Sequence, residues 1–290
     1  MNAPVKIACI QISPFYRDTE ENLKKAERYL LEACENGANL LVLPEIFNVG
    51  SPGASRQDAY AVAESVPDGK TVSKLMEIAQ TKGVYICGSM IERDGVDLYN
   101  TSVLVGPDGF IGKFRKLHLC SHEAYYYEPG DLGIPVFHTP LGRIALLICM
   151  DTYYPETFRI AALQGADIVC ASYAGADLQK SYGLPEGCHT LVPSLCMSNA
   201  NANHIYVVGC NRVGTCNGYL SAGQSIIANP NGGVATPIAP HDEEIILYAE
   251  VDLSESRRKH VDKINSRIAN RRVDVYDPML GYDKTRYQGK

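Results

Sequence analysis

Three residues of complementary chemistry each follow a short apolar run in this 290-residue chain: Glu45 after 40–43, Lys116 after 110–114 and Cys149 after 144–148. A thiol can attack a carbonyl or nitrile carbon if a base removes its proton and a cation holds the negative charge that develops. The residues therefore predict a cysteine hydrolase, with Cys149 as the nucleophile and Glu45 as the base. Lys116, helped by the backbone N–H of Met150, is expected to stabilise the oxyanion.

Cys149 lies at a predicted corner between a strand and a helix. Residues 144–148 are all apolar, too few for a helix of usual length and typical of a strand buried on both faces. Asp151 suits a helix cap, Pro155 suits the first helical turn, and Gly165 ends the expected helix. The positive end of a helix dipole lowers the pKa of a nearby thiol, whereas the simpler alternative is an inert core cysteine.

The elements around these residues alternate as in one α/β domain. Residues 5–11 and 38–45 read as strands that flank a helix, and Asp18 with Glu21 suits a capping box at its start. A helix, a glycine and an apolar strand recur at 164–171, which predicts internal pseudo-symmetry over a single domain, residues 1–290. Further strands are expected at 84–91, 98–105, 110–114, 205–210, 223–228 and 245–251, and further helices at 71–82, before Asn203 and after a Ser254 cap.

Composition narrows the class of protein and its partners. The chain is 46% hydrophobic and 21% charged, and 27 Lys and Arg against 33 Asp and Glu give a net charge of −6, so neither nucleic acid nor a membrane is an expected partner. Without a signal peptide or an apolar span, a cytoplasmic location with reduced cysteines is expected. No zinc-ribbon, dinucleotide-binding or phosphate-binding motif occurs, so neither a cofactor nor a metal is expected.

The chain resembles the nitrilase superfamily, the carbon-nitrogen hydrolases with a Glu-Lys-Cys triad. Five segments carry the resemblance in order: 43–45, 112–119, 149–156, 211–214 and 223–232. The resemblance implies a four-layer α-β-β-α sandwich with two mixed sheets. It also implies pairing through the helix after Cys149 into a homodimer or higher homo-oligomer, and the tail at 271–290 is expected to pack at the subunit interface.

The resemblance also assigns roles near Lys116. A second acid in the family often precedes an aromatic pair and Pro-Gly-Asp, and residues 123–131 fit that pattern. Glu123 is therefore expected to orient Lys116 and the substrate nitrogen, the simpler alternative being a loop carboxylate paired with a base. His118 is expected to contact substrate, and its spacing from His122 in a loop does not favour a metal site. Asp151 is expected to fix the turn beside the nucleophile through backbone hydrogen bonds.

Departures from the family pattern narrow the substrate. Branches that act on nitriles usually have Cys-Trp-Glu at the third motif, and this chain has Cys-Met-Asp at 149–151. Relatives that cleave N-carbamoyl-D-amino acids commonly have an arginine where this chain has Tyr153, and a tyrosine offers no charge-assisted fork to a carboxylate. Where many relatives have Arg-Ala-x-Glu-Asn, residues 199–203 lack both charges.

The expected substrate is a small linear amide or N-carbamoyl amine that is neutral or bears an amine, and Tyr153 is expected to contact it. Cys149 would form a thioester with release of ammonia, after which Glu45 would activate water. One alternative is a nitrilase that converts a nitrile to acid and ammonia. The alternative of another class is a non-catalytic binding or scaffold protein on the same fold, against which the complete triad argues.

Overall fold

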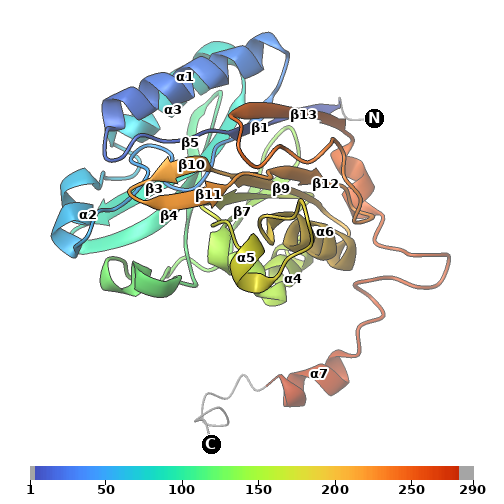
Figure 1. The fold of residues 1–290 in the computed structure, drawn as a ribbon. Coiled ribbons are helices and arrows are strands. Elements are labelled where there is room, and N and C mark those ends of the chain that lie inside the picture. Colours follow the sequence, from blue (N-terminus) through green and yellow to red (C-terminus); the bar gives the residue numbers. More distant parts are fainter. Residues whose placement is uncertain (1–3, 281–290) are drawn as a thin grey trace, which may run out of the picture.

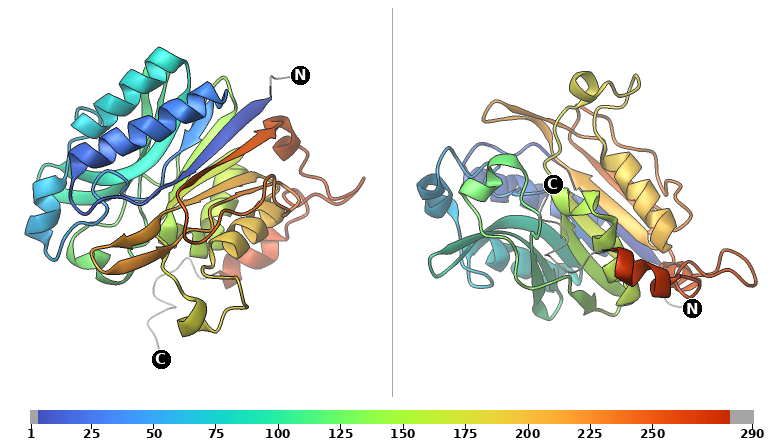
Figure 2. Two further views of the ribbon diagram at one scale, coloured as in Figure 1. Left: turned by 45° about the horizontal axis from the view of Figure 1, so that its top comes forward. Right: turned by 90° about the horizontal axis from the view of Figure 1, so that it is seen from below.

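The computed structural model describes residues 4–280, and two mixed β-sheets lie face to face in it (Figure 1). The six-stranded sheet has the order β13-β1-β2-β3-β4-β5, and the five-stranded sheet has the order β12-β9-β8-β7-β6. Helices α1 and α3 cover the outer face of the first sheet, while α4 and α6 cover the outer face of the second (Figure 2). The expected α-β-β-α sandwich is confirmed.

The first sheet and its helices come mostly from the first half of the chain. Its strands are β1 Val5–Gln11, β2 Leu40–Val42, β3 Tyr85–Asp94, β4 Asp97–Gly106, β5 Gly109–Arg115 and, from late in the chain, β13 Ile245–Val251. Its helices are α1 Thr19–Glu35, α2 Arg56–Val62 and α3 Lys70–Lys82. Asp18 caps α1 as predicted, because its carboxylate accepts a hydrogen bond from the Glu21 N–H.

The second sheet comes from the second half. Its strands are β6 Val136–His138, β7 Arg143–Ile148, β8 Ile168–Tyr173, β9 Tyr206–Asn211 and β12 Ile226–Ala228. The helices are α4 Pro155–Leu163, α5 Gln179–Tyr182, α6 Val192–Asn203 and α7 Val273–Met279, and a separate hairpin consists of β10 Val213–Cys216 and β11 Tyr219–Ala222. Three 3₁₀ turns are η1 Ser121–Tyr125, η2 Cys149–Tyr153 and η3 Leu253–Arg257.

The two sheets repeat one plan. In the first, β1, β2 and β3 run parallel, with antiparallel β13 on one side and antiparallel β4 on the other. In the second, β7, β8 and β9 run parallel between antiparallel β6 and β12. The predicted internal pseudo-symmetry is therefore present, and the parallel strands bring Glu45 and Cys149 to carboxyl ends, where open α/β sheets place their chemistry.

Burial explains why the central strands read as continuous apolar runs. Residues 40–42 of β2 and 144–148 of β7 have no exposed surface, because each strand has the other sheet on one face and helices on the other. At roughly 25 cal/mol per Å² of apolar surface, burying each of the Leu, Ile and Val side chains among them contributes about 1.5–3 kcal/mol before the cost of ordering the chain.

Some boundaries differ from the sequence prediction. Asp151 does not cap α4, because η2 separates the strand from that helix and Tyr154 is its N-cap. Ser254 does not cap a helix either, since the element there is the 3₁₀ turn η3 and its cap is Asp252. Helices α2, α5 and α7, strand β6 and the β10–β11 hairpin were not predicted.

The C-terminal segment leaves the sandwich and carries α7 away from it (Figure 1). Of the expected interface tail, 281–290 lies outside the described residues. No helix within residues 4–280 is both long and apolar enough to cross a membrane.

Candidate active site

Glu45, Lys116 and Glu123 form a buried cluster of two carboxylates around one ammonium. Lys116 Nζ donates to Glu45 Oε1 at 2.8 Å and to Glu123 Oε1 and Oε2 at 2.9 and 2.7 Å. Lys116 is 1% exposed and Glu45 is 2% exposed, so water screens these charges little. The structure thus brings together three of the four residues for which the sequence predicted catalytic roles.

Asn100 on β4 belongs to the same cluster, and it was not predicted from the sequence. Its Nδ2 donates to Glu45 Oε1 at 2.8 Å and to Glu123 Oε1 at 3.2 Å. The Lys116 N–H pairs with the Asn100 carbonyl across the β4–β5 ladder, which places both side chains on one face of the sheet. An asparagine inside a predicted strand was the signal available, because asparagine is depleted in strands.

Cys149 begins η2 directly after β7, in a strained conformation. Its φ is 41°, in the left-handed region that costs a non-glycine residue about 1–3 kcal/mol and is found mainly at functional sites. The Thr152 hydroxyl donates to the Cys149 carbonyl at 2.7 Å and so holds the turn closed. The sharp turn therefore fixes the thiol at the end of the strand, as the sequence predicted.

Burial raises the pKa of the Cys149 thiol well above its ordinary value, and the Glu45 carboxylate raises it further while Lys116 opposes the rise. The expectation that a helix dipole lowers this pKa was wrong, since η2 separates Cys149 from α4 and desolvation is the larger effect. The thiol is therefore protonated at neutral pH, and a nucleophilic attack by Cys149 needs a base.

The pKa shifts of Lys116 and Glu123 are consistent with an attack by Cys149 that a base assists. Burial opposes the charge of Lys116, but Glu45, Cys149 and Glu123 outweigh it and raise the pKa of the ammonium well above its usual range. Burial raises the pKa of Glu123 despite the nearby Lys116, and Glu45 adds to the rise. The cluster thus holds a permanent cation and a carboxylate that ionises less readily than usual.

Asp151 ties the second and third motifs together. Its Oδ1 accepts from the backbone N–H groups of Leu117 and His118 at 3.1 and 3.0 Å, and its Oδ2 accepts from the Ile148 N–H at 3.2 Å. The carboxylate has no exposed surface, so these bonds fix the turns after β5 and β7 relative to each other. The expected structural role of Asp151 is confirmed.

His118 is held on two sides. Its Nδ1 lies 2.9 Å from Asp151 Oδ1, and its ring stacks on that of Tyr154 with centroids 3.7 Å apart. The predicted contact of His118 with substrate stays a prediction. The oxyanion role of the Met150 N–H also stays a prediction. It is consistent with the position of Met150 at the start of η2, where N–H groups lack intrahelical partners.

Cys149 contributes to the pKa values of two tyrosines. Tyr153 is 39% exposed, and partial burial followed by the charge of Cys149 raises its pKa to about 12. Tyr219, on the β10–β11 hairpin, also has a raised pKa, for which burial and then Cys149 are again the leading causes. Tyr182 is among the groups that raise the pKa of Tyr153. Tyr219 was missed because the hairpin that carries it was not predicted.

Asn199 occupies the position of the arginine in the Arg-Ala-x-Glu-Asn segment of many relatives, and this chain lacks both charges of that segment. Asn199 on α6 donates through Nδ2 to the Thr152 carbonyl at 3.4 Å and to the Leu195 carbonyl at 3.0 Å. Because Thr152 lies in η2, the amide joins α6 to the turn that carries Cys149. A neutral hydrogen bond therefore provides a link between these two elements.

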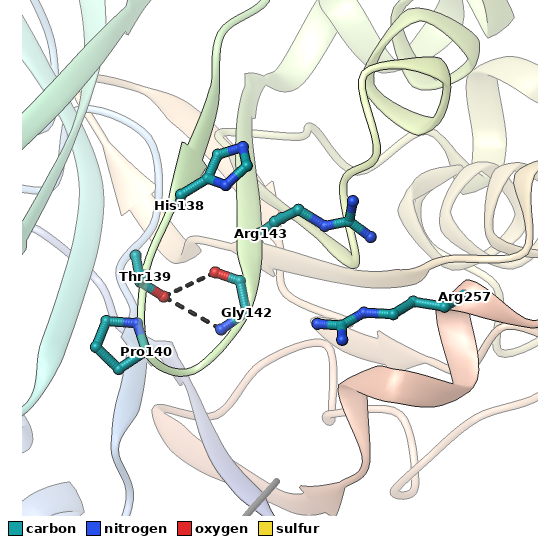
Figure 3. A pocket seen from close by; sticks show the side chains of 6 residues that line it. All are labelled: His138, Thr139, Pro140, Gly142, Arg143 and Arg257. Atoms are coloured by element: carbon teal, nitrogen blue, oxygen red, sulfur yellow. Dashed lines mark hydrogen bonds between the residues drawn. The ribbon is translucent and has the colours of Figure 1, made fainter.

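A surface cavity of about 430 Å³ lies elsewhere, beside the β6–β7 turn (Figure 3). Arg143 and Arg257 line it, and both guanidinium groups pair with the fully buried Asp167 at 3.0 Å. In the turn itself, the Thr139 hydroxyl donates to the Gly142 carbonyl. We interpret this cluster as structural.

Within residues 4–280, no group of three or more His, Cys, Asp or Glu residues is arranged to hold a metal ion.

Comparisons with known proteins agree with this geometry. Residues 6–260 match the family described as carbon-nitrogen hydrolase. The chain is 38% identical over 272 residues to a protein named nitrilase from Pyrococcus abyssi, covering 94% of this chain and 99% of the relative. It is 30% identical over 302 residues to the N-carbamoylputrescine amidase of Solanum lycopersicum, covering 97% of each.

The fold matches that of a solved amidase from Nesterenkonia sp. AN1, described as a member of the nitrilase superfamily, with a TM-score of 0.76, 24% identity and coverage of 96% of this chain and 98% of that one. The family match spans most of the chain, and it agrees with the five motifs and the sandwich fold. The chain therefore belongs to the carbon-nitrogen hydrolases of the nitrilase superfamily.

Proposed function

We propose that this carbon-nitrogen hydrolase cleaves a small linear amide or an N-carbamoyl amine through a thioester on Cys149. The observation that carries the proposal is the buried cluster in which Lys116 bonds to both Glu45 and Glu123, with Cys149 close enough to raise the pKa of the lysine. A protonated thiol beside a carboxylate and an ammonium is the arrangement that general-base activation of a nucleophile requires.

In the first half of the proposed reaction, Glu45 removes the thiol proton while Cys149 Sγ bonds to the carbonyl carbon. Lys116 and the backbone N–H of Met150 stabilise the negative oxygen of the tetrahedral intermediate. The C–N bond then breaks, the departing nitrogen takes up the proton, and ammonia leaves. Glu123 orients Lys116 and the nitrogen during this step, and the acyl group stays on sulfur.

In the second half, Glu45 takes a proton from water, and the resulting hydroxide attacks the thioester carbon. The C–S bond breaks, the thiol regains its proton and the acid leaves. When the substrate is an N-carbamoyl amine, the product released is a carbamate, which decomposes to the amine and carbon dioxide.

The substrate is proposed to be neutral or to bear an amine. Tyr153 and Tyr219 lie close enough to Cys149 for their pKa values to respond to it, and aromatic rings accept a cation over their faces. Glu45 and Glu123 together outnumber the cation Lys116 in this cluster, so a substrate carboxylate would meet repulsion there. The N-carbamoylputrescine amidases among the relatives, each about 30% identical, support an amine-bearing substrate.

Nitrile hydrolysis is the second candidate, and the 38% identical relative named nitrilase favours it. A panel of amides, N-carbamoyl amines and nitriles at neutral pH, assayed for ammonia, separates the candidates. The proposal expects amides or N-carbamoyl amines to give the highest kcat/KM. Turnover of nitriles alone would overturn the substrate assignment, and no ammonia from any class would favour a non-catalytic protein.

We also propose that two copies of the chain associate through α4 and the C-terminal segment. Ile160 and Leu163 on α4 are 42% and 46% exposed, and Met279 on α7 is 75% exposed. Burial of such apolar groups against a second copy removes them from water. Light scattering after size exclusion should give at least twice the chain mass, and Ile160→Asp should reduce it, whereas a monomer at micromolar concentration would contradict the proposal.

A further inference from the structure

The amide of Asn100 lies where its two N–H groups serve two different carboxylates. Nδ2 is 2.8 Å from Glu45 Oε1 and 3.2 Å from Glu123 Oε1, and Asn100 has no exposed surface. Two carboxylates that share a single ammonium repel each other, and each neutral donor that faces them offsets part of that repulsion. Asn100 therefore contacts both acids of the proposed site without carrying charge itself.

Ser89 fixes which way that amide points. Ser89 Oγ accepts a hydrogen bond from the Ile46 N–H at 2.9 Å and lies 3.1 Å from Asn100 Oδ1. Because the hydroxyl oxygen already accepts from the Ile46 N–H, its single hydrogen is free to donate to Oδ1. A flipped amide would turn Oδ1 toward the two carboxylates and lose both bonds, so the observed orientation is the one that the serine selects.

The same serine supports a strained turn next to Glu45. Ile46 has a φ of 48°, and a β-branched residue in the left-handed region is a genuine outlier. Its N–H is held by Ser89 from β3, while the Glu45 N–H donates to the Tyr173 carbonyl of β8 at 3.2 Å. The backbone around Glu45 is thus fixed by both sheets, and its carboxylate is fixed by Asn100.

We propose that Ser89 and Asn100 form a positioning pair that holds Glu45 by Oε1 and keeps its other oxygen, Oε2, for the thiol proton. This inference rests on the proposed role of Glu45 as the base. The pair touches neither substrate nor thiol in the proposed reaction and acts only through Glu45 and Glu123. Loss of the pair should therefore leave Glu45 Oε2 less well placed to take the thiol proton, and it should lower kcat more than it raises KM.

Ser89→Ala is the main test, with Ser102→Ala as its matched control. Ser102 is opposite Ser89 in the β3–β4 ladder and is equally buried, but its hydroxyl has no hydrogen-bond partner among the described residues. Asn100→Asp is the second variant, because it keeps the shape of the side chain, exchanges the donor for an acceptor and adds a negative charge beside the two carboxylates.

Asn100→Asp is expected to lower kcat by about 10- to 100-fold, the range for losing hydrogen bonds to a charged group, and Ser89→Ala, which frees the amide to turn, by up to the same factor. They should also move the acid limb of the pH–kcat/KM profile to higher pH, because a carboxylate that loses a donor holds its proton more tightly. Ser102→Ala should match the wild type in both readouts.

A second readout does not depend on turnover: the pH dependence of Cys149 alkylation by iodoacetamide, followed by peptide mass mapping. The proposal expects the acid limb of alkylation to shift to higher pH in both variants. If the wild type is alkylated at Cys149 but hydrolyses nothing, the proposed function fails. The pH dependence of alkylation still tests whether Ser89 and Asn100 position Glu45. Folded variants, as judged by near-UV circular dichroism, with wild-type profiles would overturn the inference. If Asn100→Asp does not fold, Ser89→Ala decides alone.

Discussion

Arg115 and Lys116 are consecutive residues at the end of β5, yet their cations belong to two different buried clusters on opposite faces of the sheet. Arg115 contacts Glu92 with both Nε and Nη2, at 3.1 and 2.7 Å, and Lys113 also bonds to Glu92. Around Glu92 the buried carboxylate has more than one cation. Around Lys116 the buried cation has more than one carboxylate.

The number of cations that bond to each buried carboxylate decides how readily that carboxylate takes up a proton. Burial opposes ionisation of Glu92, but hydrogen bonds from Arg115 and Lys113 outweigh it and lower its pKa. Burial raises the pKa of Glu123, and its single cation Lys116 does not overcome the rise. A buried carboxylate that bonds to two cations stays in one charge state and stabilises the fold, whereas two carboxylates that share one cation can take up and release a proton.

The largest expected effect separates the nucleophile from the other thiols. Cys149→Ala should lower kcat by about 10⁴-fold or more, because no other group can form the acyl intermediate. Cys34→Ala is the control, a partly exposed cysteine on α1 on the outer face of the first sheet. Ammonia release by both purified variants checks the prediction, and substantial activity of Cys149→Ala would remove the thiol from the reaction.

The next effect compares two lysines that each pair with a buried carboxylate. Lys116→Gln should lower kcat by about 10²- to 10³-fold, as expected for loss of a group that stabilises the oxyanion. Lys113→Gln should leave kcat within about twofold and change the free energy of unfolding by at most about 1 kcal/mol, because Lys113 is partly solvated and Arg115 remains beside Glu92. Equal losses of activity would mean that the two clusters are not functionally distinct.

The third prediction is a variant that changes the stability of the fold and leaves the activity almost unchanged. Glu92→Gln should lower the free energy of unfolding by about 1–3 kcal/mol, because it removes the buried carboxylate that bonds to Arg115 and leaves this guanidinium paired with the exposed Asp94 and Asp131. The activity per folded molecule should change little. Urea unfolding followed by fluorescence or circular dichroism measures the first quantity, and a stable but inactive Glu92→Gln protein would contradict the division of roles.

The smallest expected effect is on the pH dependence of the free energy of unfolding, to which Glu92 and Glu123 should contribute with opposite signs. The folded protein lowers the pKa of Glu92 below the ordinary 4.5, so its contribution to stability is present above pH 4.5 and is lost as the pH falls through the lowered pKa. The folded protein raises the pKa of Glu123 above 4.5, so its contribution is present below pH 4.5 and is lost as the pH rises through the raised pKa.

Unfolding free energies of the wild type, Glu92→Gln and Glu123→Gln between pH 3.5 and 7 check the signs. The advantage of the wild type over Glu92→Gln should shrink only on the acid side. Its advantage over Glu123→Gln should shrink as the pH rises. Parallel curves for the two variants would mean that the two carboxylates do not differ in proton affinity.

Much of the sandwich could be predicted from local pattern. The strands at Val5–Gln11 and Ile245–Val251 have the predicted boundaries, because each is a short β-rich run bounded by polar residues. The start of α1 was also predicted, since Asp18 acts on its own first turn. The β10–β11 hairpin was not predicted, because its strands are short and two of their residues, Tyr219 and Leu220, are half exposed.

The candidate site was predictable in its chemistry but not in its supports. Glu45, Lys116 and Cys149 each end a recognisable strand, so their types and places could be found from the chain. The partnership of Ser89 with Asn100 depends on the pairing of β3 with β4, which no local pattern specifies. The raised pKa of Cys149 likewise depends on burial at the end of β7 and on Glu45, which is distant in the sequence.

The most direct test of the proposed thioester mechanism is to trap the intermediate on Cys149. The wild-type enzyme is quenched in acid during steady-state turnover of the best amide or N-carbamoyl substrate, digested and mapped by mass spectrometry. We expect an acyl or carbamoyl mass on the peptide that contains Cys149, formed and lost at rates compatible with kcat and absent from Cys149→Ala. Turnover without any adduct on Cys149, or with the adduct on another residue, would contradict it.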